Sequence, residues 1–419
     1  MGQTIAQKIL AAHSGNDAVE VGQIVTVTPD YVLSHDNTAA ISKKFEKLPI
    51  ERVKNPEQPV IVLDHTVPPS TAQYANNHKQ IREFVEKNGI VHFYDVGRGI
   101  CHQVLVEEGF AFPGALILGA DSHTTTYGAL GAASAGIGRS EVAAVWATGE
   151  MWLMVPPSVK IIVHGELPRG VASKDLMLWI IGHIGADGAL YKSIEFYGEA
   201  IEKMSLSSRM VLSNMAVEAG AKFGIVPPDE KVDEFLKGRA TREYEKVFAD
   251  PDAEYEQTLE FNADEVVPVV AAPHNVDNMV KISDLDEVRV NQVLIGSCTN
   301  GRTEDFHMAA EILAGRKVAP GTRLLLFPAS SRVLMDILLD GTAQKLVEAG
   351  AILMNPGCGP CLGAHEGVLA DGEVCVSTTN RNFKGRMGNK NAFIYLASPY
   401  TAAAAAVAGK IVDPREFLD

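Results

Sequence analysis

The last third of the chain alternates short apolar runs with amphipathic stretches, and this alternation limits the fold more than any other feature. Apolar runs that predict buried strands lie at 288–295, 323–327, 351–354 and 373–377, with a less regular candidate at 391–396. Segments 304–313 and 332–349, between them, have the periodicity of helices. Short buried strands joined by helices form a parallel sheet covered on both faces. We therefore predict a doubly wound α/β fold here.

Polar or conformationally unusual residues follow each of the first four strands. They form four clusters, at 297–300, 330–332, 355–363 and 378–381. The third cluster holds a C-x-x-C pair among glycines and prolines, a composition suited to a loop that wraps around a bound group. Ligands of open α/β sheets bind outside the carboxyl ends of the strands. We therefore expect Cys298, Cys358 and Cys361 to lie at one edge of one sheet.

The first part of the chain repeats this organisation. Runs at 59–64, 90–96 and 115–118 predict strands, and His65, His102 and His123 follow them. The middle holds a strand at 159–163 and an acidic segment, 229–256, which reads as an exposed helix or insertion. The domains predicted from these patterns are 1–157, 158–284 and 285–419, in line with about 150 residues per domain.

Composition excludes several classes of protein. The net charge of −15 argues against a general nucleic-acid binder, because such proteins replace counterions with basic surface. Apolar runs are too short for a membrane span, and the N-terminus does not read as a secretory signal. Five cysteines, an odd number in a long chain, disfavour a disulfide framework. We therefore expect a cytoplasmic protein whose thiols serve metal binding, catalysis or packing.

Three converging thiolates are compatible with two kinds of metal centre. One is a zinc site with a fourth ligand. The other is a [4Fe–4S] cluster in which one iron lacks a protein thiolate and can act as a Lewis acid. Cys101 and Cys375 are the candidates for a fourth ligand. Cys375 lies inside a predicted strand and reads better as a buried structural thiol, whereas Cys101, beside His102, stays open.

Histidines and carboxylates occur together at the predicted strand ends. Asp64 adjoins His65, and Asp121 lies two residues from His123. A carboxylate fixes the tautomer of an imidazole and raises its basicity, which suits general acid–base catalysis. The alternative is that each histidine only satisfies polar groups in a buried turn. A histidine follows three of the predicted strands, however, and this recurrence favours catalysis.

Two arginines, Arg381 and Arg386, follow the fourth strand. A guanidinium presents two parallel donors to a carboxylate. Alone, either arginine reads as solvated or structural. Beside a metal centre the pair would bind an anionic substrate.

Together these residues resemble the aconitase superfamily, and within it the large subunits of 3-isopropylmalate dehydratase and homoaconitase. The resemblance covers residues 1–419 and implies an aconitase-like fold, with three α/β/α domains around a central cluster site. The motifs that carry it are DHTVP at Asp64, ICHQV around Cys101, GADSHTTTYGALGA from Gly119, SNMAVEAGA from Ser213, IGSCTNGR from Ile295, NPGCGPCLG from Asn355 and TNRNFKGR from Thr379.

The resemblance also implies roles for individual residues. A [4Fe–4S] cluster would be bound by Cys298, Cys358 and Cys361, with Asn214 and Asn380 lining it. The residues expected to handle departure and return of water are Asp64, His65, His102, Asp121, His123 and Glu218. The residues expected to contact substrate are His35, Asp36, Ser122, Arg381 and Arg386. His35 stands where aconitases proper have glutamine, which favours a different substrate.

The resemblance further implies a partner. Full-length aconitases carry a fourth, swivelling domain with the serine base, and this sequence stops soon after the third. Residues 330–332 (Ser-Ser-Arg) resemble a triplet of that domain only superficially. We therefore expect a small subunit that supplies the swivelling domain, in a heterodimer or heterotetramer.

The expected reaction is isomerisation of a small di- or tricarboxylate hydroxy acid by dehydration and rehydration. The first choice is 3-isopropylmalate dehydratase, in leucine biosynthesis. Homoaconitase and 2,3-dimethylmalate dehydratase are close alternatives. An RNA-binding regulatory relative and a structural zinc protein are alternatives from other classes, and the acidic charge counts against the first of these.

Overall fold

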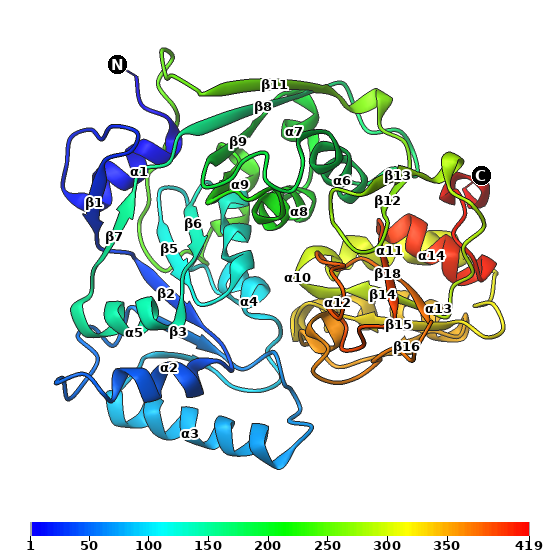
Figure 1. Cartoon of the computed structure of the whole chain (residues 1–419), viewed down its shortest axis with the longest axis horizontal. Helices are drawn as coiled ribbons and strands as arrows, with labels where there is room; N and C mark the ends of the chain where they lie inside the picture. The colour runs from blue at the N-terminus through cyan, green and yellow to red at the C-terminus, as the bar shows by residue number, and fades with distance from the viewer. Residues whose placement is uncertain (1, 419) are drawn as a thin grey trace.

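Three β-sheets flanked by helices form the body of the protein, which a computed structural model describes for residues 2–418 (Figure 1). The sheets follow one another along the chain, from blue and cyan through green to yellow and red. All strand pairs of the first two sheets are parallel. The third sheet is parallel except at one edge. The predicted α/β fold with mostly parallel sheets is confirmed.

The first sheet has the strand order β4-β3-β2-β5-β6. Its strands are β2 (Tyr31–Ser34), β3 (Pro59–Val62), β4 (His92–Tyr94), β5 (Leu116–Gly119) and β6 (Ala133–Gly136). Its helical segments are α1 (Ile5–Ser14), α2 (Thr38–Phe45), α3 (Ala72–Asn88), α4 (Cys101–Glu107), η1 (Ser122–Leu130) and α5 (Arg139–Thr148), and β1 (Ile24–Val27) pairs antiparallel with β7 (Met151–Met154). The sequence predicted β3, β4 and β5. It missed β2, a four-residue run at the centre of the sheet, and β6, which is rich in small residues.

The second sheet has the order β10-β9-β8-β11. Its elements are β8 (Ser158–His164), α6 (Ser173–Ile184), β9 (Ser193–Tyr197), α7 (Glu199–Lys203), α8 (Leu206–Met215), η2 (Ala216–Ala219), β10 (Phe223–Ile225), α9 (Glu230–Leu236) and β11 (Gln257–Asn262). The acidic segment that the sequence marked as exposed forms α9 and then returns to the first sheet. There Tyr31 donates a hydrogen bond to Thr241 (2.9 Å) and Arg242 pairs with Asp30 (2.8 Å). Its polar residues therefore have partners far away in the chain.

The third sheet has the order β13-β12-β18-β17-β14-β15-β16. Its strands are β12 (Val269–Ala271), β13 (Met279–Lys281), β14 (Gln292–Gly296), β15 (Arg323–Phe327), β16 (Ile352–Leu353), β17 (Val374–Ser377) and β18 (Phe393–Leu396). Its helices are α10 (Ser297–Asn300), α11 (Thr303–Leu313), α12 (Ser331–Leu339), α13 (Thr342–Glu348) and α14 (Pro399–Ala408), and short 3₁₀ turns are η3 (Ala263–Glu265), η4 (Ile282–Asp284), η5 (Gly359–Leu362) and η6 (Pro414–Phe417). Because β12 and β13 precede residue 285, this sheet starts earlier than the sequence division, and the three domain ranges stay a prediction.

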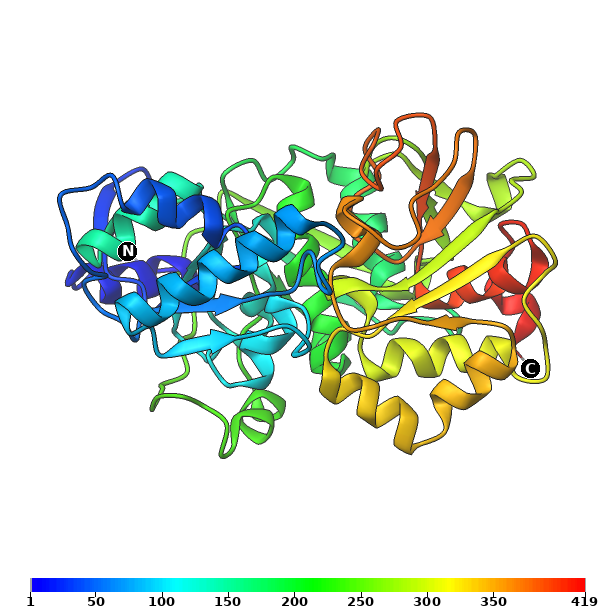
Figure 2. The ribbon, with the colours of Figure 1, turned by 90° about the horizontal axis from the view of Figure 1, so that it is seen from below.

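Packing joins the three parts around the strand ends. One hydrophobic core includes residues of both the second and the third sheet, among them Phe196 and Phe327. The first and third parts face one another (Figure 2) and meet where the Ile100 amide donates to the Ala329 carbonyl (2.8 Å). Ser330 caps α12 and also donates to Glu107 (2.5 Å). Residues 330–332 thus belong to a contact between the first and third parts. Within residues 2–418, the helices are too short or too polar to cross a membrane.

Candidate functional site

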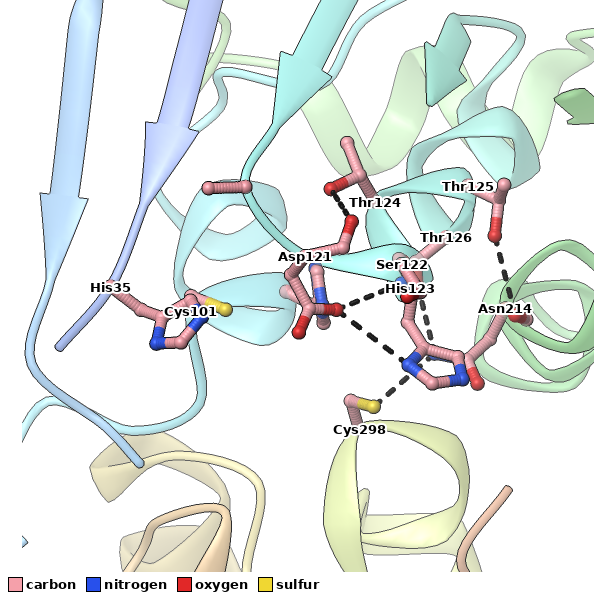
Figure 3. A network of polar contacts seen from close by, with 12 residues as sticks. His35, Cys101, Asp121, Ser122, His123, Thr124, Thr125, Thr126, Asn214 and Cys298 are labelled. Atoms are coloured by element: carbon pink, nitrogen blue, oxygen red, sulfur yellow. Dashed lines mark hydrogen bonds and ion pairs between the residues drawn. The ribbon is translucent and has the colours of Figure 1, made fainter. Parts of the chain in front are cut away.

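The carboxyl ends of parallel strands from two sheets converge on one region. Strands β2, β3 and β5 lead into the loops of His35, His65 and Asp121, while β14 and β17 lead into Cys298 and Asn380. Figure 3 shows Asp121 in the middle, with His35 and Cys101 on one side, His123 on the other and Cys298 opposite. The fold therefore brings together carboxylates, imidazoles and thiols that are far apart in sequence.

Asp64 and His65 form a tight pair at the end of β3. The Asp64 Oδ1 atom lies 2.6 Å from His65 Nδ1, and Asp64 Oδ2 accepts the Cys101 amide (2.7 Å). On the other side of the ring, His65 Nε2 is 3.7 Å from Asp121 Oδ2. Burial alone would lower the pKa of His65, but the two carboxylates outweigh burial and raise the pKa well above its usual value. The two carboxylates therefore favour the protonated form of His65.

Asp121 is the shared acceptor of the site. It accepts His102 Nε2 (2.8 Å) and the His123 amide (2.8 Å), and it faces His65. Burial opposes ionisation, but the three histidines hold the pKa of Asp121 well below its usual range. The other nitrogen of His102, Nδ1, lies 3.1 Å from the Tyr127 hydroxyl, so both ring nitrogens of His102 are engaged.

His123 lies in a second chain of polar contacts. Its Nε2 is 2.7 Å from Glu218 Oε1, and the same oxygen accepts Arg381 Nε (2.7 Å). Arg381 Nη1 reaches the Ser122 hydroxyl (3.5 Å). Burial lowers the pKa of His123, but hydrogen bonds to Asp121 and Glu218 raise it above the usual value overall. This chain of contacts brings together His123, Glu218, Ser122 and Arg381.

Cys298 occupies a strained turn directly after β14. Gly296 has φ 152°, and a Cβ there would lie 2.3 Å from the Phe327 carbonyl oxygen, so only glycine fits; Ser297 is left-handed, with φ 77°. The Cys298 Sγ atom receives the side-chain amides of Asn214 (3.3 Å) and Asn380 (3.4 Å). Two donors aimed at one sulfur are suited to a thiolate or a metal-bound sulfur.

Cys358 and Cys361 lie on the loop after β16. The Cys358 amide donates to the Asp64 carbonyl (2.9 Å), which ties this loop to the acid–base pair. Arg386 Nη2 lies 3.4 Å from Cys361 Sγ. A hydrogen bond from Cys358 and the charge of Arg386 hold the pKa of Cys361 well below its usual value. Of the thiols predicted to bind a cluster, Cys298 thus has amide donors at its sulfur and Cys361 has a guanidinium.

The remaining two thiols differ from these three. Cys375 lies in β17 inside the hydrophobic core, as the sequence favoured. Cys101 is the first residue of α4, and its backbone amide donates to the Asp64 carboxylate. Burial raises the pKa of the Cys101 thiol well above its usual value. All five thiols are free and buried.

His35 and Asp36 follow β2 but face different groups. The His35 ring stacks on His65, with centroids 3.6 Å apart, and burial and the neighbouring imidazole lower its pKa to about 4. Asp36 accepts the backbone amides of Asp64 (2.9 Å), His65 (2.8 Å) and Thr66 (3.1 Å), and lies 2.8 Å from His78 Nε2. The Asp36 carboxylate is thus occupied in shaping the loop that carries Asp64 and His65.

Asp36→Asn is expected to lower the free energy of unfolding at pH 7.5 by about 3 kcal/mol, because one amide oxygen replaces a charged acceptor of several buried donors. Burial opposes ionisation of Asp36, but its histidine and threonine partners hold its pKa well below the usual value. A depressed folded-state pKa stabilises the fold above the unfolded-state pKa, about 3.9, and this contribution disappears as the pH falls toward the folded-state value. The difference from wild type should therefore shrink on acidification below about pH 5.

Urea unfolding at pH 7.5 and pH 4 measures this prediction. Asp95→Asn, which breaks an exposed pair with Arg82 (2.7 Å), is the matched control and should cost less than about 1 kcal/mol. Equal stability of the two variants at pH 7.5 would show that Asp36 does not organise the loop.

Two residues that support this geometry were missing from the sequence prediction. Tyr127 contacts His102, and Arg302, which is buried, donates to the carbonyls of Cys298 (2.7 Å) and Thr299 (2.7 Å). Tyr127 lies inside the motif GADSHTTTYGALGA and Arg302 inside IGSCTNGR. Their position in these motifs could have marked them as candidate site residues, but their contacts depend on the fold.

Comparisons with known proteins point to one family. A model of the aconitase family (aconitate hydratase) matches residues 7–287 and 283–409. The chain is 51% identical to 3-isopropylmalate dehydratase large subunit 1 of Methanopyrus kandleri, over 100% of both chains. It is 51% identical to a probable methanogen homoaconitase large subunit of Methanosarcina mazei, over 93% of this chain and 99% of the relative. Among solved structures, aconitase X of Thermococcus kodakaraensis matches with a TM-score of 0.50, 12% identity and 92% coverage of each chain; at that identity the likeness concerns the fold.

Proposed function

The chain belongs to the aconitase family, and on that premise we propose that it is the large subunit of a [4Fe–4S]-dependent hydro-lyase that isomerises a hydroxy acid. One observation carries the proposal. Three buried thiols lie beside a carboxylate–histidine network that can hold protons, and in two of them, Cys298 and Cys361, side-chain donors point at the sulfur. A structural zinc site would have no need of the carboxylate–histidine network.

The residues present fit a cluster. We assign Cys298, Cys358 and Cys361 as its ligands, with Asn214 and Asn380 donating to the Cys298 sulfur. When bound, the cluster supplies an iron with an open coordination position that polarises a substrate oxygen. Cys375 is enclosed in β17 and the hydrophobic core, which supports leaving it out of the ligand set.

The chain's own side chains divide the acid–base work. His65, protonated because two carboxylates raise its pKa, holds a proton for a departing hydroxyl. Asp121 keeps His65 and His102 oriented. The Glu218–His123 pair holds a second proton close by.

Two arginines give the site its affinity for an anion. Arg381 is fixed by Glu218 and Ser122. The Nε atom of Arg386 lacks a hydrogen-bond partner within residues 2–418. We assign both arginines, with Ser122 and the neutral His35, to binding the substrate carboxylates. The local positive charge explains how a chain of net charge −15 binds an anionic acid.

The substrate that we favour is 3-isopropylmalate, which places the protein in leucine biosynthesis in the cytoplasm. Several relatives at 45–51% identity along nearly the whole chain carry the name 3-isopropylmalate dehydratase large subunit. Homoaconitase is the second candidate, because a relative of the same identity has that name. A 2,3-dimethylmalate dehydratase would share this chemistry. The name large subunit supports a small partner subunit, to which we assign the swivelling domain and the base.

We expect the chain alone, after anaerobic cluster reconstitution, to show less than about 1% of the activity of the reconstituted pair, since removal of one acid–base group typically costs 10²–10⁴-fold. The measurement is the absorbance of the unsaturated acid, with 3-isopropylmalate and homocitrate as separate substrates. Comparable activity of the chain alone would refute the two-subunit proposal. A salt-dependent RNA shift by the cluster-free protein, without turnover by the pair, would favour a regulatory function.

A further inference from the structure

Lys174 is a fully buried lysine that neither motif nor mechanism accounts for. It lies in the first turn of α6, and its side chain is inaccessible to solvent. Its ammonium donates to the carbonyl oxygens of Thr378 (2.9 Å) and Thr379 (2.6 Å), more than 200 residues further along the chain. The adjacent Asp175 is turned away and accepts the amides of Ala172 (2.9 Å) and Val269 (3.2 Å). Two backbone carbonyls are therefore the hydrogen-bond acceptors of Lys174.

These two carbonyls begin the turn that carries site residues. The next residue, Asn380, donates to Asn214 (3.2 Å) and to the Cys298 sulfur (3.4 Å). Arg381 follows and bonds Glu218. Peptide planarity points the Asn380 amide N–H away from the Thr379 carbonyl, and so away from Lys174. Fixing both carbonyls therefore fixes the direction from which Asn380 and Arg381 enter the site.

Burying an ammonium is costly unless hydrogen bonds or charge partners compensate for the lost water, and here two backbone carbonyls do so. Burial lowers the pKa of Lys174 to about 7, while the nearby thiols Cys298 and Cys361 and the carboxylates Asp305 and Glu218 act to raise it. The ammonium thus lies within electrostatic reach of two of the proposed cluster ligands. Packing alone gives no reason for a lysine at this position.

We infer that Lys174 is a positioning residue: its ε-amino group clamps the Thr378–Thr379 turn, so that Asn380 meets Cys298 and Arg381 meets Glu218. Its effect on turnover passes through Asn380 and Arg381. The kinetic part of the inference rests on the proposed function, whereas the clamp itself is a property of the chain with or without a cluster.

Hydrogen exchange of the cluster-free chain tests the clamp directly. Lys174→Met removes both hydrogen bonds at nearly constant volume, and peptides covering 378–386 are expected to exchange at least about tenfold faster, which corresponds to about 1.4 kcal/mol. Lys231→Met is the matched control, because Lys231 also donates to backbone carbonyls, those of Glu202, Lys203 and Met204, but on the surface. It should leave exchange over 378–386 unchanged. Unchanged exchange in Lys174→Met would overturn the inference.

Kinetics and spectroscopy of the reconstituted pair test the consequence. A displaced Arg381 weakens carboxylate binding, so the KM for 3-isopropylmalate is expected to rise at least about tenfold in Lys174→Met, and the electron paramagnetic resonance spectrum of the reduced cluster to change. Lys174→Gln keeps a shorter hydrogen-bond donor but no charge, and it should raise the KM less than Lys174→Met does. If Lys174→Met does not fold, Lys174→Gln takes its place in both experiments. If Lys174→Met lowers kcat but leaves the KM and the electron paramagnetic resonance spectrum unchanged, Lys174 has a merely structural role. If the pair lacks activity with every acid tested, the proposed function fails, and hydrogen exchange still decides the clamp.

Discussion

Cys298→Ser is expected to abolish binding of the iron–sulfur cluster and to reduce turnover at least about 10³-fold, because Lewis-acid assistance contributes several kcal/mol and each 1.4 kcal/mol is a factor of ten. Serine keeps the shape of the residue but replaces a soft thiolate by a hydroxyl that binds iron poorly. The side-chain amides of Asn214 and Asn380, which point at the Cys298 sulfur, would face a hydroxyl oxygen in place of a thiolate. Cys358→Ser and Cys361→Ser should have the same result.

The measurement is iron and acid-labile sulfide per chain after anaerobic reconstitution, together with the visible absorbance of the cluster. Wild type should hold about four of each. Cys375→Ser is the matched control: its thiol is equally buried but lies in β17, so it should keep the cluster. Bleaching by Cys375→Ser would show that the ligand assignment is wrong. Zinc without sulfide in the wild-type protein would exclude the hydro-lyase.

Asp121→Asn is expected to lower kcat by about 10²–10⁴-fold, the usual contribution of a positioned acid–base system. The carboxylate faces His65, accepts His102 and caps the His123 amide, so one substitution disturbs all three imidazoles. An asparagine of the same size can still accept from His102 and the His123 amide through its one oxygen, but it turns an NH₂ group toward His65 and carries no charge. The fold should survive, because the change is nearly isosteric.

The pH dependence of the same variant has a defined sign. Burial lowers the pKa of His65, and Asp64 and Asp121 together raise it above its usual value. Removing the Asp121 charge lowers that pKa, so His65 loses its proton at lower pH, and the alkaline limb of kcat/KM should move toward neutral pH. Asp340→Asn is the control, because Asp340 pairs with His307 at the surface (2.6 Å) and should change neither kcat nor the profile. A profile of unchanged shape in Asp121→Asn would remove His65 from the acid role.

Much of the fold could be predicted because the local pattern of apolar residues indicates where strands and helices lie. Apolar runs of five to eight residues marked β3, β14, β15 and β17, and helical periodicity marked α11. Strand β2 escaped notice because its four residues follow a turn and have no repeat of their own, although it lies at the centre of the first sheet. The general geometry of parallel sheets predicted that Cys298, Cys358 and Cys361 share one sheet edge. That Asp64 and Asp121, which follow strands of a different sheet, lie near them was implied only by the family resemblance.

The sequence by itself determined the chemistry available to this protein: which thiols, imidazoles and guanidinium groups stand after strands, since residue type and local pattern carry that information. Tertiary structure decided what each group does. Asp36 turned out to organise the loop of Asp64 and His65, and Lys174 to hold a turn of the third sheet, because hydrogen bonds depend on direction and on partners that the chain brings from far away. A sequence pattern records which donors and acceptors exist, whereas only the fold selects which of them meet.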